Sequence, residues 1–289
     1  MPRGLDHVVH LVRDLDAAGE LYDLLGFTVG GRNQHPWGTH NRIVQTPGFF
    51  IELLQVAEAE KIPPNAPGRL SFGAVNEDFL ARNGEGLTML VLEGRDPAAE
   101  KAAFDAAGIG GFETFDFTRT ARRMDGAEVE VGFSLAFARQ PGEDDFTAFT
   151  CTQRKPENFW STALQQHSNH VEAVAGVVLV ADAPEAQAAF ISTLAEVPAA
   201  PVAEGWLQAQ TPRGRIDVMT RPLYAEHYGV PAPGTAGLRL AAVRFATPGA
   251  PDLRRALAAR RMLQEGITGM TVVPPSVAMG AALVFEPVQ

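Results

Sequence analysis

A pattern of strand, aspartate and helix recurs along this chain, and the recurrence constrains the fold more strongly than any other feature. In the first copy, alternating apolar residues run from Leu5 to Val12, and a helical pattern of apolar residues follows. An aspartate stands between strand and helix, where it can cap the helix, and an aromatic residue follows it by eight positions. Three copies share this spacing: Asp14 with Tyr22, Asp96 with Phe104, and Asp182 with Phe190. A fourth, weaker copy begins at residues 238–245 and lacks the aspartate.

Each copy predicts one β-α-β-β-β module whose sheet is apolar on at least one face. A single module cannot cover that face, so two modules must pair to complete a core. The sequence therefore predicts an α+β fold of four βαβββ modules at residues 1–56, 86–153, 173–221 and 238–287. We expect two domains, at residues 1–160 and 170–289, and a linker loop over residues 57–83, where Pro and Gly recur.

The composition excludes several classes of protein. With 46% hydrophobic and 20% charged residues the chain is typical of a globular protein, and its net charge of -10 argues against a nucleic-acid partner. The sequence has no apolar stretch long enough for a membrane span and no signal-peptide pattern, so we expect a cytoplasmic protein. The single cysteine, Cys151, agrees with a reducing compartment and is expected in a buried strand. Neither glycine-rich nucleotide motif occurs, which predicts no nucleotide cofactor.

Four segments carry a family resemblance: Leu5-Asp-His-Val-Val, Trp37-Gly-Thr-His-Asn41, Phe50-Ile-Glu-Leu-Leu54, and Phe149-Thr-Cys-Thr-Gln-Arg-Lys-Pro-Glu157 at the joint between the halves. With the repeated modules, they resemble the vicinal oxygen chelate superfamily of glyoxalases, bleomycin-resistance proteins and dioxygenases. The resemblance covers nearly the whole chain and is closest to a glyoxalase-like branch named as a third glyoxalase family. It implies that paired modules form cup-shaped mixed sheets, each of which can hold a small molecule.

The resemblance also implies a metal site. In the superfamily a divalent ion is commonly held by His or carboxylate residues from the first and last strand of each module. His7 and Glu52 match these positions in the first module, whereas Met89 replaces the histidine in the second, whose last strand has no carboxylate. Because two protein ligands do not make a tight site, other residues near the joint would have to complete it. The candidates are Gln153, His167 and His170, and Zn, Ni, Mn, Mg and Fe all stay open.

The same cup offers candidate catalytic and substrate-binding residues. Glu52 lies among apolar residues that would raise its pKa, which suits a general base. Thr39 and Asn41 belong to a Gly-Thr-x-Asn element typical of the resembling branch, and we expect them, with His40, to contact the substrate or shape the turn. Alternation along a strand puts His40 and Asn41 on opposite faces. Arg119 is a candidate for clamping a substrate carboxylate.

The second half of the chain lacks the histidines. Counting from the aspartate places Ala175 and Ala242 at the histidine positions, and Asp217 alone matches a last-strand carboxylate. An extradiol dioxygenase would need two histidines and a glutamate in these later modules, where Glu286 is the only match. We therefore expect a structural half, or one with a second pocket and no metal.

These observations predict a glyoxalase-like enzyme that acts on a small oxygenated molecule in the first cup, with isomerase, lyase or hydrolase chemistry assisted by a divalent ion. The alternative is a non-catalytic protein that binds a small molecule or an antibiotic, which the missing ligands favour. An extradiol-type dioxygenase is the second alternative. Dimerisation is possible but not required, because the internal pairing already completes the cups.

Overall fold

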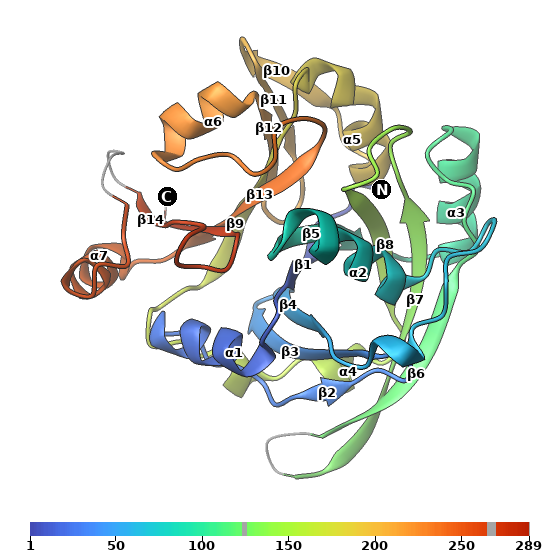
Figure 1. The fold of residues 1–289 in the computed structure, drawn as a ribbon, viewed down its shortest axis with the longest axis horizontal. Helices are drawn as coiled ribbons and strands as arrows, with labels where there is room; N and C mark the ends of the chain where they lie inside the picture. The colour runs from blue at the N-terminus through green and yellow to red at the C-terminus, as the bar shows by residue number, and fades with distance from the viewer. Residues whose placement is uncertain (123–125, 265–269, 289) are drawn as a thin grey trace.

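The chain folds into two mixed β-sheets that lie side by side, with helices on both faces of the sheets (Figure 1). The computed structural model describes residues 1–122, 126–264 and 270–288. The first sheet comprises strands within residues 5–153, and the second comprises strands within residues 173–286. The predicted α+β architecture is thereby confirmed. Within the described residues, no helix has the length and apolar character needed to cross a membrane.

The first sheet has eight strands in the order β2-β3-β4-β1-β5-β8-β7-β6. The first module supplies β1 (Leu5–Leu11), α1 (Leu15–Leu24), β2 (Asn33–Gln34), β3 (Thr39–Thr46) and β4 (Phe49–Val56). The second supplies β5 (Gly86–Glu93), α3 (Pro97–Ala106), β6 (Phe115–Arg122), β7 (Glu128–Ala138) and β8 (Thr147–Gln153). Strands β1 and β5 pair antiparallel at the centre, and each pairs in parallel with the last strand of its own module. The two modules are therefore related by an approximate two-fold axis between β1 and β5.

The second sheet repeats this pairing with seven strands in the order β10-β11-β12-β9-β13-β15-β14. Its third module has β9 (Ala173–Val180), η3 (Pro184–Gln187), α5 (Ala188–Ala195), β10 (Ala199–Ala203), β11 (Trp206–Gln210) and β12 (Arg215–Met219). Helix α6 (Arg221–Tyr228) leads to the fourth, with β13 (Arg239–Ala246), α7 (Ala250–Ala259), β14 (Thr271–Val273) and β15 (Ala282–Glu286). Short helices α4 (Pro156–Phe159) and η2 (Thr162–Gln165) join the two halves.

The repeated aspartates act as helix caps in the first two modules. Asp14 accepts hydrogen bonds from two backbone N–H groups at the start of α1, and Asp96 does the same for α3. Asp182 differs, because its carboxylate binds the Arg221 side chain and the backbone N–H of Gly237. The spacing of the third copy therefore marks the module but not a cap.

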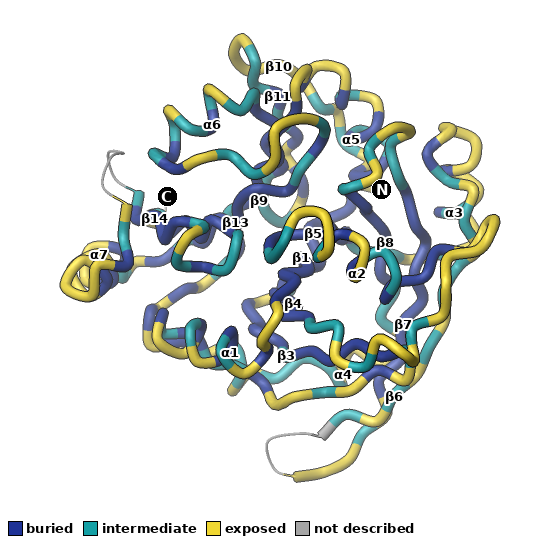
Figure 2. Tube along the Cα trace, viewed as in Figure 1, coloured by how far each residue is buried: buried dark blue, intermediate teal, exposed yellow. Residues whose placement is uncertain are grey.

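Alternation along the strands sends side chains to two different cores. Val8 and Leu90 on the central strands face a core that both sheets share, whereas Val9 and Met89 face the interior of the first cup. His10 lies on the shared-core side, where its ring nitrogens bind the Tyr22 hydroxyl and the Met279 carbonyl. Figure 2 shows the consequence, with the central strands of both sheets buried and strand β10 exposed at the edge of its sheet.

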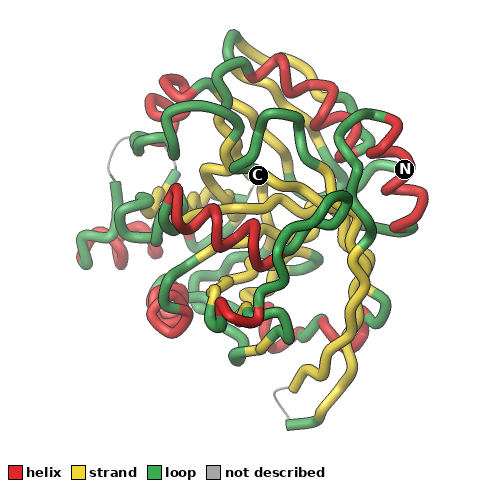
Figure 3. The backbone as a smooth tube through the Cα atoms, turned by 45° about the vertical axis from the view of Figure 1, so that its right-hand side comes forward, coloured by secondary structure: helices red, strands yellow, loops and turns green. Residues whose placement is uncertain are grey.

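The first sheet curls until its two edge strands meet. Strands β2 and β6 lie at opposite ends of the strand order, yet Arg119 Nη1 on β6 donates to Asn33 Oδ1 on β2 at 2.9 Å. Strands β6 and β7 form a long two-stranded ribbon that extends from the body of the molecule (Figure 3). This closure turns the sheet into a cup, and it makes Arg119 part of the seam.

The prediction of a linker loop over residues 57–83 is wrong in its second half. Residues Phe72–Asn83 form helix α2, which Ser71 caps by accepting a hydrogen bond from Ala74 N. Phe72 and Phe79 on this helix are buried in the core of the first cup. The apolar residues of this helix recur at helical spacing, but the Pro-rich residues before Ser71 favoured the prediction of a loop. In the second cup, α6 contributes Tyr224 and Tyr228 in the same way.

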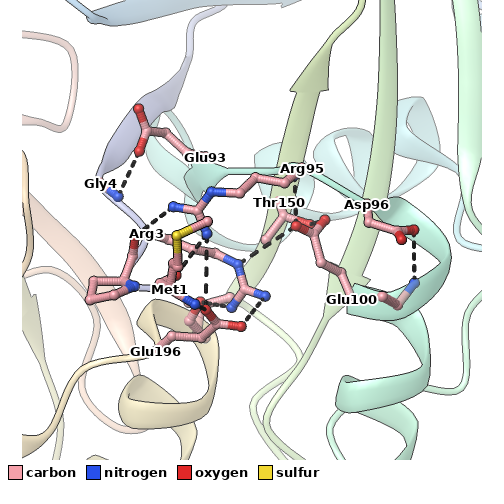
Figure 4. A network of polar contacts seen from close by, with 12 residues as sticks. Met1, Arg3, Gly4, Glu93, Arg95, Asp96, Glu100, Thr150 and Glu196 are labelled. Atoms are coloured by element: carbon pink, nitrogen blue, oxygen red, sulfur yellow. Dashed lines mark hydrogen bonds and ion pairs between the residues drawn. The ribbon is translucent and has the colours of Figure 1, made fainter.

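A polar network fixes the start of β1 against the second half of the chain (Figure 4). The buried Arg3 pairs with Glu196 at 2.8 Å and donates to the Leu194 carbonyl at 3.0 Å. Arg95 donates to the backbone carbonyls of Met1 and Pro2, which lie just before the strand. These contacts hold the strand that carries Asp6 and His7 in register with both halves.

Candidate functional site

The first cup contains a cavity of ≈ 50 Å³ with mostly aromatic walls. Its polar lining consists of His7, His35, Asn41, Glu52 and Arg119. Its aromatic lining consists of Trp37, Phe50, Phe72, Phe115, Phe117, Phe133, Phe149 and Phe159. A few polar groups converging in an aromatic cavity are typical of small-molecule sites.

His7 is oriented by its neighbour in the sequence. The β1–β5 register shifts between Leu5 and His7, so Asp6 bulges from the strand and its Oδ1 lies 2.5 Å from His7 Nδ1. The ring also stacks on Phe50, with centroids 4.2 Å apart. Since Nδ1 is bound to Asp6, Nε2 is the ring nitrogen left for a molecule in the cup. Behind this pair, Gln153 Nε2 donates to Asp6 Oδ2 at 3.0 Å.

Glu52 is a buried carboxyl group held by an amide. It lies opposite Val9 on β4, so it points into the cup beside His7, and its Oε1 accepts a hydrogen bond from Asn41 Nδ2 at 2.6 Å. Burial raises the pKa of Glu52, while His7, the Asn41 hydrogen bond and Arg119 oppose that rise. A chain of amides extends the contact, since Asn33 Nδ2 donates to Asn41 Oδ1 and Asn33 Oδ1 accepts from Arg119 Nη1.

Thr39 reaches the site through His35. Its hydroxyl lies 2.9 Å from His35 Nδ1, and the His35 ring stacks on Trp37 with centroids 4.6 Å apart. Burial lowers the pKa of His35 to about 3, and the charge of Arg119 adds to the effect. His35 is therefore a neutral wall of the cavity at ordinary pH.

A wider outer pocket of ≈ 600 Å³ adjoins this inner cavity. Ile43, Arg119 and Phe159 line both, so they form the junction between the two. The outer pocket is more polar, and its lining includes Arg32, Asn33 and Gln45 as well as Asn158, Phe159, Trp160, Ser161 and Leu164 of the joint. A bound molecule can therefore extend from the inner cavity past Arg119 into the outer pocket.

Several residues predicted from the sequence are not brought to the inner cavity. His40 faces away from Asn41 and lies near Arg32 and Glu58. His167 uses both ring nitrogens for backbone contacts: Nδ1 accepts from Thr28 N and Nε2 donates to the Gln45 carbonyl. Gln153 lies behind Asp6, in an interdomain pocket of ≈ 310 Å³. His170 is an exposed residue with a positive φ in the joint. Of the five predicted metal ligands, only His7 and Glu52 share the cup.

The positions that the resemblance assigns to the other two ligands are apolar. Val9 on β1 pairs with Glu52 on one side and Met89 on the other. The approximate two-fold axis relates His7 to Met89 and Glu52 to Phe149. Phe149 lies edge-on to His7, with ring centroids 5.5 Å apart. These residues do not fit a four-ligand metal centre.

One other group could be considered for a metal. Asp6, His7 and Cys151 have ligand atoms within 4.8 Å of one another, and no other such trio occurs in the ranges that the structure describes. The hydrogen bond between Asp6 and His7 already uses two of these atoms. Burial raises the pKa of the Cys151 thiol well above its usual range, with help from nearby carboxylates. A metal here would have to displace that hydrogen bond and ionise the thiol.

The second cup is filled by an ion network. Arg244 Nη1 binds the fully buried Asp217 at 2.7 Å, and its Nη2 binds Glu286 at 2.8 Å. The register places Gly176, and not the predicted Ala175, at the position of His7, because Ala175 corresponds to the bulged Asp6. Ala242 does occupy the position of Met89, as predicted. Glu286, the residue on which a dioxygenase site would depend, is committed to Arg244.

Sequence reasoning missed Asp6 and Asn33, and it indicated His35 only as one member of a polar cluster, without a role in the site. The motif Leu5-Asp-His-Val contains Asp6, but regular alternation places adjacent residues on opposite faces and hides a contact that requires a bulge. Asn33 and His35 surround the turn before β3, and the polar density of residues 32–41 was the available signal. The phenylalanines of β6 to β8 recur at alternate positions, a pattern that also describes an ordinary core.

Comparison with known proteins identifies the family. A family model described as a glyoxalase-like domain matches residues 5–195, which is more than half of the chain. No curated protein matches the chain. A hypothetical protein from Staphylococcus aureus has a similar structure, with a TM-score of 0.70, 14% identity and coverage of 100% of both chains.

Two further solved structures share the fold at low identity. One is a triple variant of 4-hydroxymandelate synthase from Streptomyces coelicolor, with a TM-score of 0.57, 12% identity and coverage of 99% of this chain and 92% of that one. The other is a Mn(II)-bound glyoxalase from Novosphingobium aromaticivorans, with a TM-score of 0.57, 10% identity and coverage of 99% and 83%. These structures share the fold, and the family model that matches more than half of the chain shows that the chain belongs to the glyoxalase-like domain family.

Proposed function

We propose that the first cup binds a small oxygenated molecule with an apolar body, and that Glu52 and His7 move a proton on it in an isomerase or lyase reaction. One observation carries the proposal: two proton-exchanging side chains face the same aromatic cavity from adjacent strands, and each is fixed by a polar neighbour. Such fixed acid–base pairs are what proton transfer requires.

The residues support a simple division of roles. The Glu52 carboxylate takes the proton from a carbon beside a carbonyl group, and the electron pair of the C–H bond moves toward the carbonyl oxygen. When His7 donates Nδ1–H to Asp6, the Nε2 lone pair accepts the proton of an adjacent hydroxyl group. Return of the two protons to the exchanged positions completes an isomerisation, with no net loss of atoms or electrons. Burial raises the pKa of Glu52, which brings it closer to the range useful for general base catalysis.

The metal-assisted form of this chemistry is a separate question. A glyoxalase of similar fold is Mn(II)-bound, which supports a metal in the superfamily's cup. In this chain Met89 and Phe149 stand where two ligands would be expected, so we derive no step through a metal. The proposal rests on His7 and Glu52 themselves.

Hydrogen exchange tests the proposal without a known substrate. Wild-type protein is incubated in D2O with a panel of small α-hydroxy carbonyl compounds, and loss of the C–H signal is followed by proton NMR. We expect exchange for at least one compound, and a decrease of about 100-fold or more in Glu52→Gln, because general base catalysis contributes about 10²- to 10⁴-fold. Glu58→Gln is the matched control, since Glu58 lies on the outside of the cup near His40. Equal rates in wild type and Glu52→Gln would refute the role of Glu52.

The rate of exchange should also depend on pH in a defined direction. Because only the ionised form of Glu52 is a base, exchange should rise with pH and level off above the raised pKa of this group.

The same shift has the opposite sign for stability. The folded protein holds the Glu52 proton more tightly than the unfolded chain does. The stability that this group contributes is therefore present at low pH and is lost as the pH rises through the pKa of Glu52 in the folded protein. In wild type the free energy of unfolding should therefore fall as the pH rises above the range in which an ordinary glutamate titrates. In Glu52→Gln this fall should be smaller.

Metal analysis provides a second test. For tag-free protein we expect well under one equivalent of any transition metal, because the cup supplies only two of the expected ligands. His7→Ala and Glu52→Ala are measured in parallel by inductively coupled plasma mass spectrometry. Near-stoichiometric metal in wild type that both variants lose would contradict this expectation and support the metal-assisted enzyme instead.

Non-catalytic binding is the alternative that the aromatic walls favour. A protein that sequesters an apolar molecule needs the ring-lined cavity but has no use for the Asp6–His7 pair or for Glu52. Saturable binding of the same compounds without exchange at any pH would support this alternative.

A further inference from the structure

We infer that the ligand of the first cup carries a carboxylate that pairs with Arg119 at the junction of the two pockets, while its apolar body lies among the aromatic rings. This inference rests on the proposed small-molecule function and adds the chemical class of the ligand. Two observations support it: the surroundings of Arg119, and the ion pairs that Arg3 and Arg244 form.

Arg119 is a half-buried cation without a counterion. Its Nη1 donates to the neutral Asn33, and its Nε is buried without a hydrogen-bond partner among the described residues. No carboxylate in the described ranges lies within ion-pair distance of its guanidinium, although Glu52 is near enough to interact electrostatically. Removing a guanidinium from water without a partner is costly, so such a group is normally paired or functional.

Two other buried arginines, Arg3 and Arg244, are paired with carboxylates, whereas Arg139, like Arg119, donates to a neutral side chain. Arg3 is paired with Glu196 and lies 3.7 Å from Glu100. Arg244, in the second cup, is paired with both Asp217 and Glu286. Arg119 has no equivalent of these carboxylates, and it faces a cavity instead. A bound anion would supply the missing charge.

The available charge favours one carboxylate over a phosphate. Arg32 also lines the outer pocket, but its Nη2 is already paired with Asp16 at 2.8 Å. One unpaired guanidinium therefore faces a single anionic group, and its planar N–H groups match the two oxygens of a carboxylate. The buried Glu52 carboxyl nearby disfavours a second negative charge.

The position of Arg119 orients the ligand. It lines both pockets, so the anionic end would lie at the junction and the body would reach inward between rings from β4, β6, β7 and β8. His7 and Glu52 line the inner cavity, where they would meet an atom of the body and not the carboxylate itself. Because the inner cavity of ≈ 50 Å³ is smaller than the roughly 150 Å³ that holds a benzene ring, a ligand with a ring would also have to occupy part of the outer pocket of ≈ 600 Å³.

Binding titrations test the inference separately from catalysis. Phenylacetate and 3-phenylpropanoate are compared with their neutral amides by quenching of tryptophan fluorescence, since Trp37 and Trp160 line the two pockets. We expect wild type to bind the better acid about 10-fold more tightly than its amide, because one charge-assisted contact contributes on this scale. Arg119→Gln should abolish the preference, and Arg119→Lys should keep part of it. Arg254→Gln removes an exposed charge on α7 and should leave the preference unchanged.

Each other outcome overturns the inference. Equal binding of acids and amides, no saturable binding of either, or a preference that Arg32→Gln abolishes and Arg119→Gln does not would exclude Arg119 as a carboxylate anchor. Tighter Arg119-dependent binding of phenyl phosphate would replace carboxylate by phosphate. Because Glu52-dependent hydrogen exchange is measured independently, the proposed function can survive the loss of this inference, and the reverse also holds.

Discussion

Arg244→Ala is expected to lower the free energy of unfolding by about 3–5 kcal/mol, the usual cost of removing one partner from a buried ion network. The guanidinium lies between Asp217, which is 0% exposed, and Glu286. Trp206 Nε1 and Gln208 Nε2 also donate to Asp217, and the partly exposed Arg215 binds it at 3.0 Å, but Arg244 is the buried cation that joins Asp217 to Glu286. The change should appear as a lower midpoint in urea unfolding followed by circular dichroism.

Two controls separate the buried ion network from a general effect of losing an arginine. Arg215 binds the same Asp217 carboxylate at 3.0 Å but its side chain is 28% exposed, so Arg215→Ala should cost about 1 kcal/mol or less. Adding Asp217→Asn to Arg244→Ala should recover part of the lost stability, because it removes a buried charge whose remaining cationic partner, Arg215, is partly exposed. If Arg244→Ala were as mild as Arg215→Ala, the network would not be what stabilises the second cup.

Most of the fold follows from the sequence because its signals are local and repeated. The spacing of Asp14 to Tyr22 and its copies locates the modules, and the alternating apolar residues locate their central strands. The apolar face of one module must be buried against another, which fixes the pairing without further information. Helix α2 escaped prediction because the Pro-rich segment before Ser71 dominated the local composition.

The site is less predictable because it depends on contacts between distant segments. His7 and Glu52 belong to recognisable motifs, and the structure places both in the inner cavity. The bulge that turns Asp6 toward His7 is set by pairing with β5, some eighty residues away in the chain. The contact between Arg119 and Asn33 exists only because the sheet closes, which no local pattern reports. His167 looked equally suitable as a ligand until its backbone contacts were visible.

Asp6→Asn is expected to reduce hydrogen exchange in the first cup by about 100-fold or more, as removing the charged partner of a catalytic histidine commonly does. When Nε2 of His7 accepts a proton, the imidazolium is stabilised by the carboxylate beside Nδ1. Asparagine keeps the shape but removes this charge. If its amide nitrogen turns toward Nδ1, it also stabilises the wrong tautomer, with the proton on Nε2. Nitrogen-15 NMR of labelled His7 should report the change in tautomer or protonation directly.

The comparison with Glu93→Gln decides whether this loss is specific. Glu93 lines the same interdomain pocket as Asp6 but pairs with Arg213 at 2.8 Å and does not contact His7. Neutralising Glu93 should therefore leave exchange within about twofold of wild type, while thermal unfolding confirms that both variants are folded. Similar losses of exchange in both variants would mean that exchange depends on the total negative charge of this pocket and not on the pairing of Asp6 with His7. A folded Asp6→Asn protein with full exchange and an unchanged His7 spectrum would show that Asp6 only supports the bulge, and Glu52 would then have to act without the dyad.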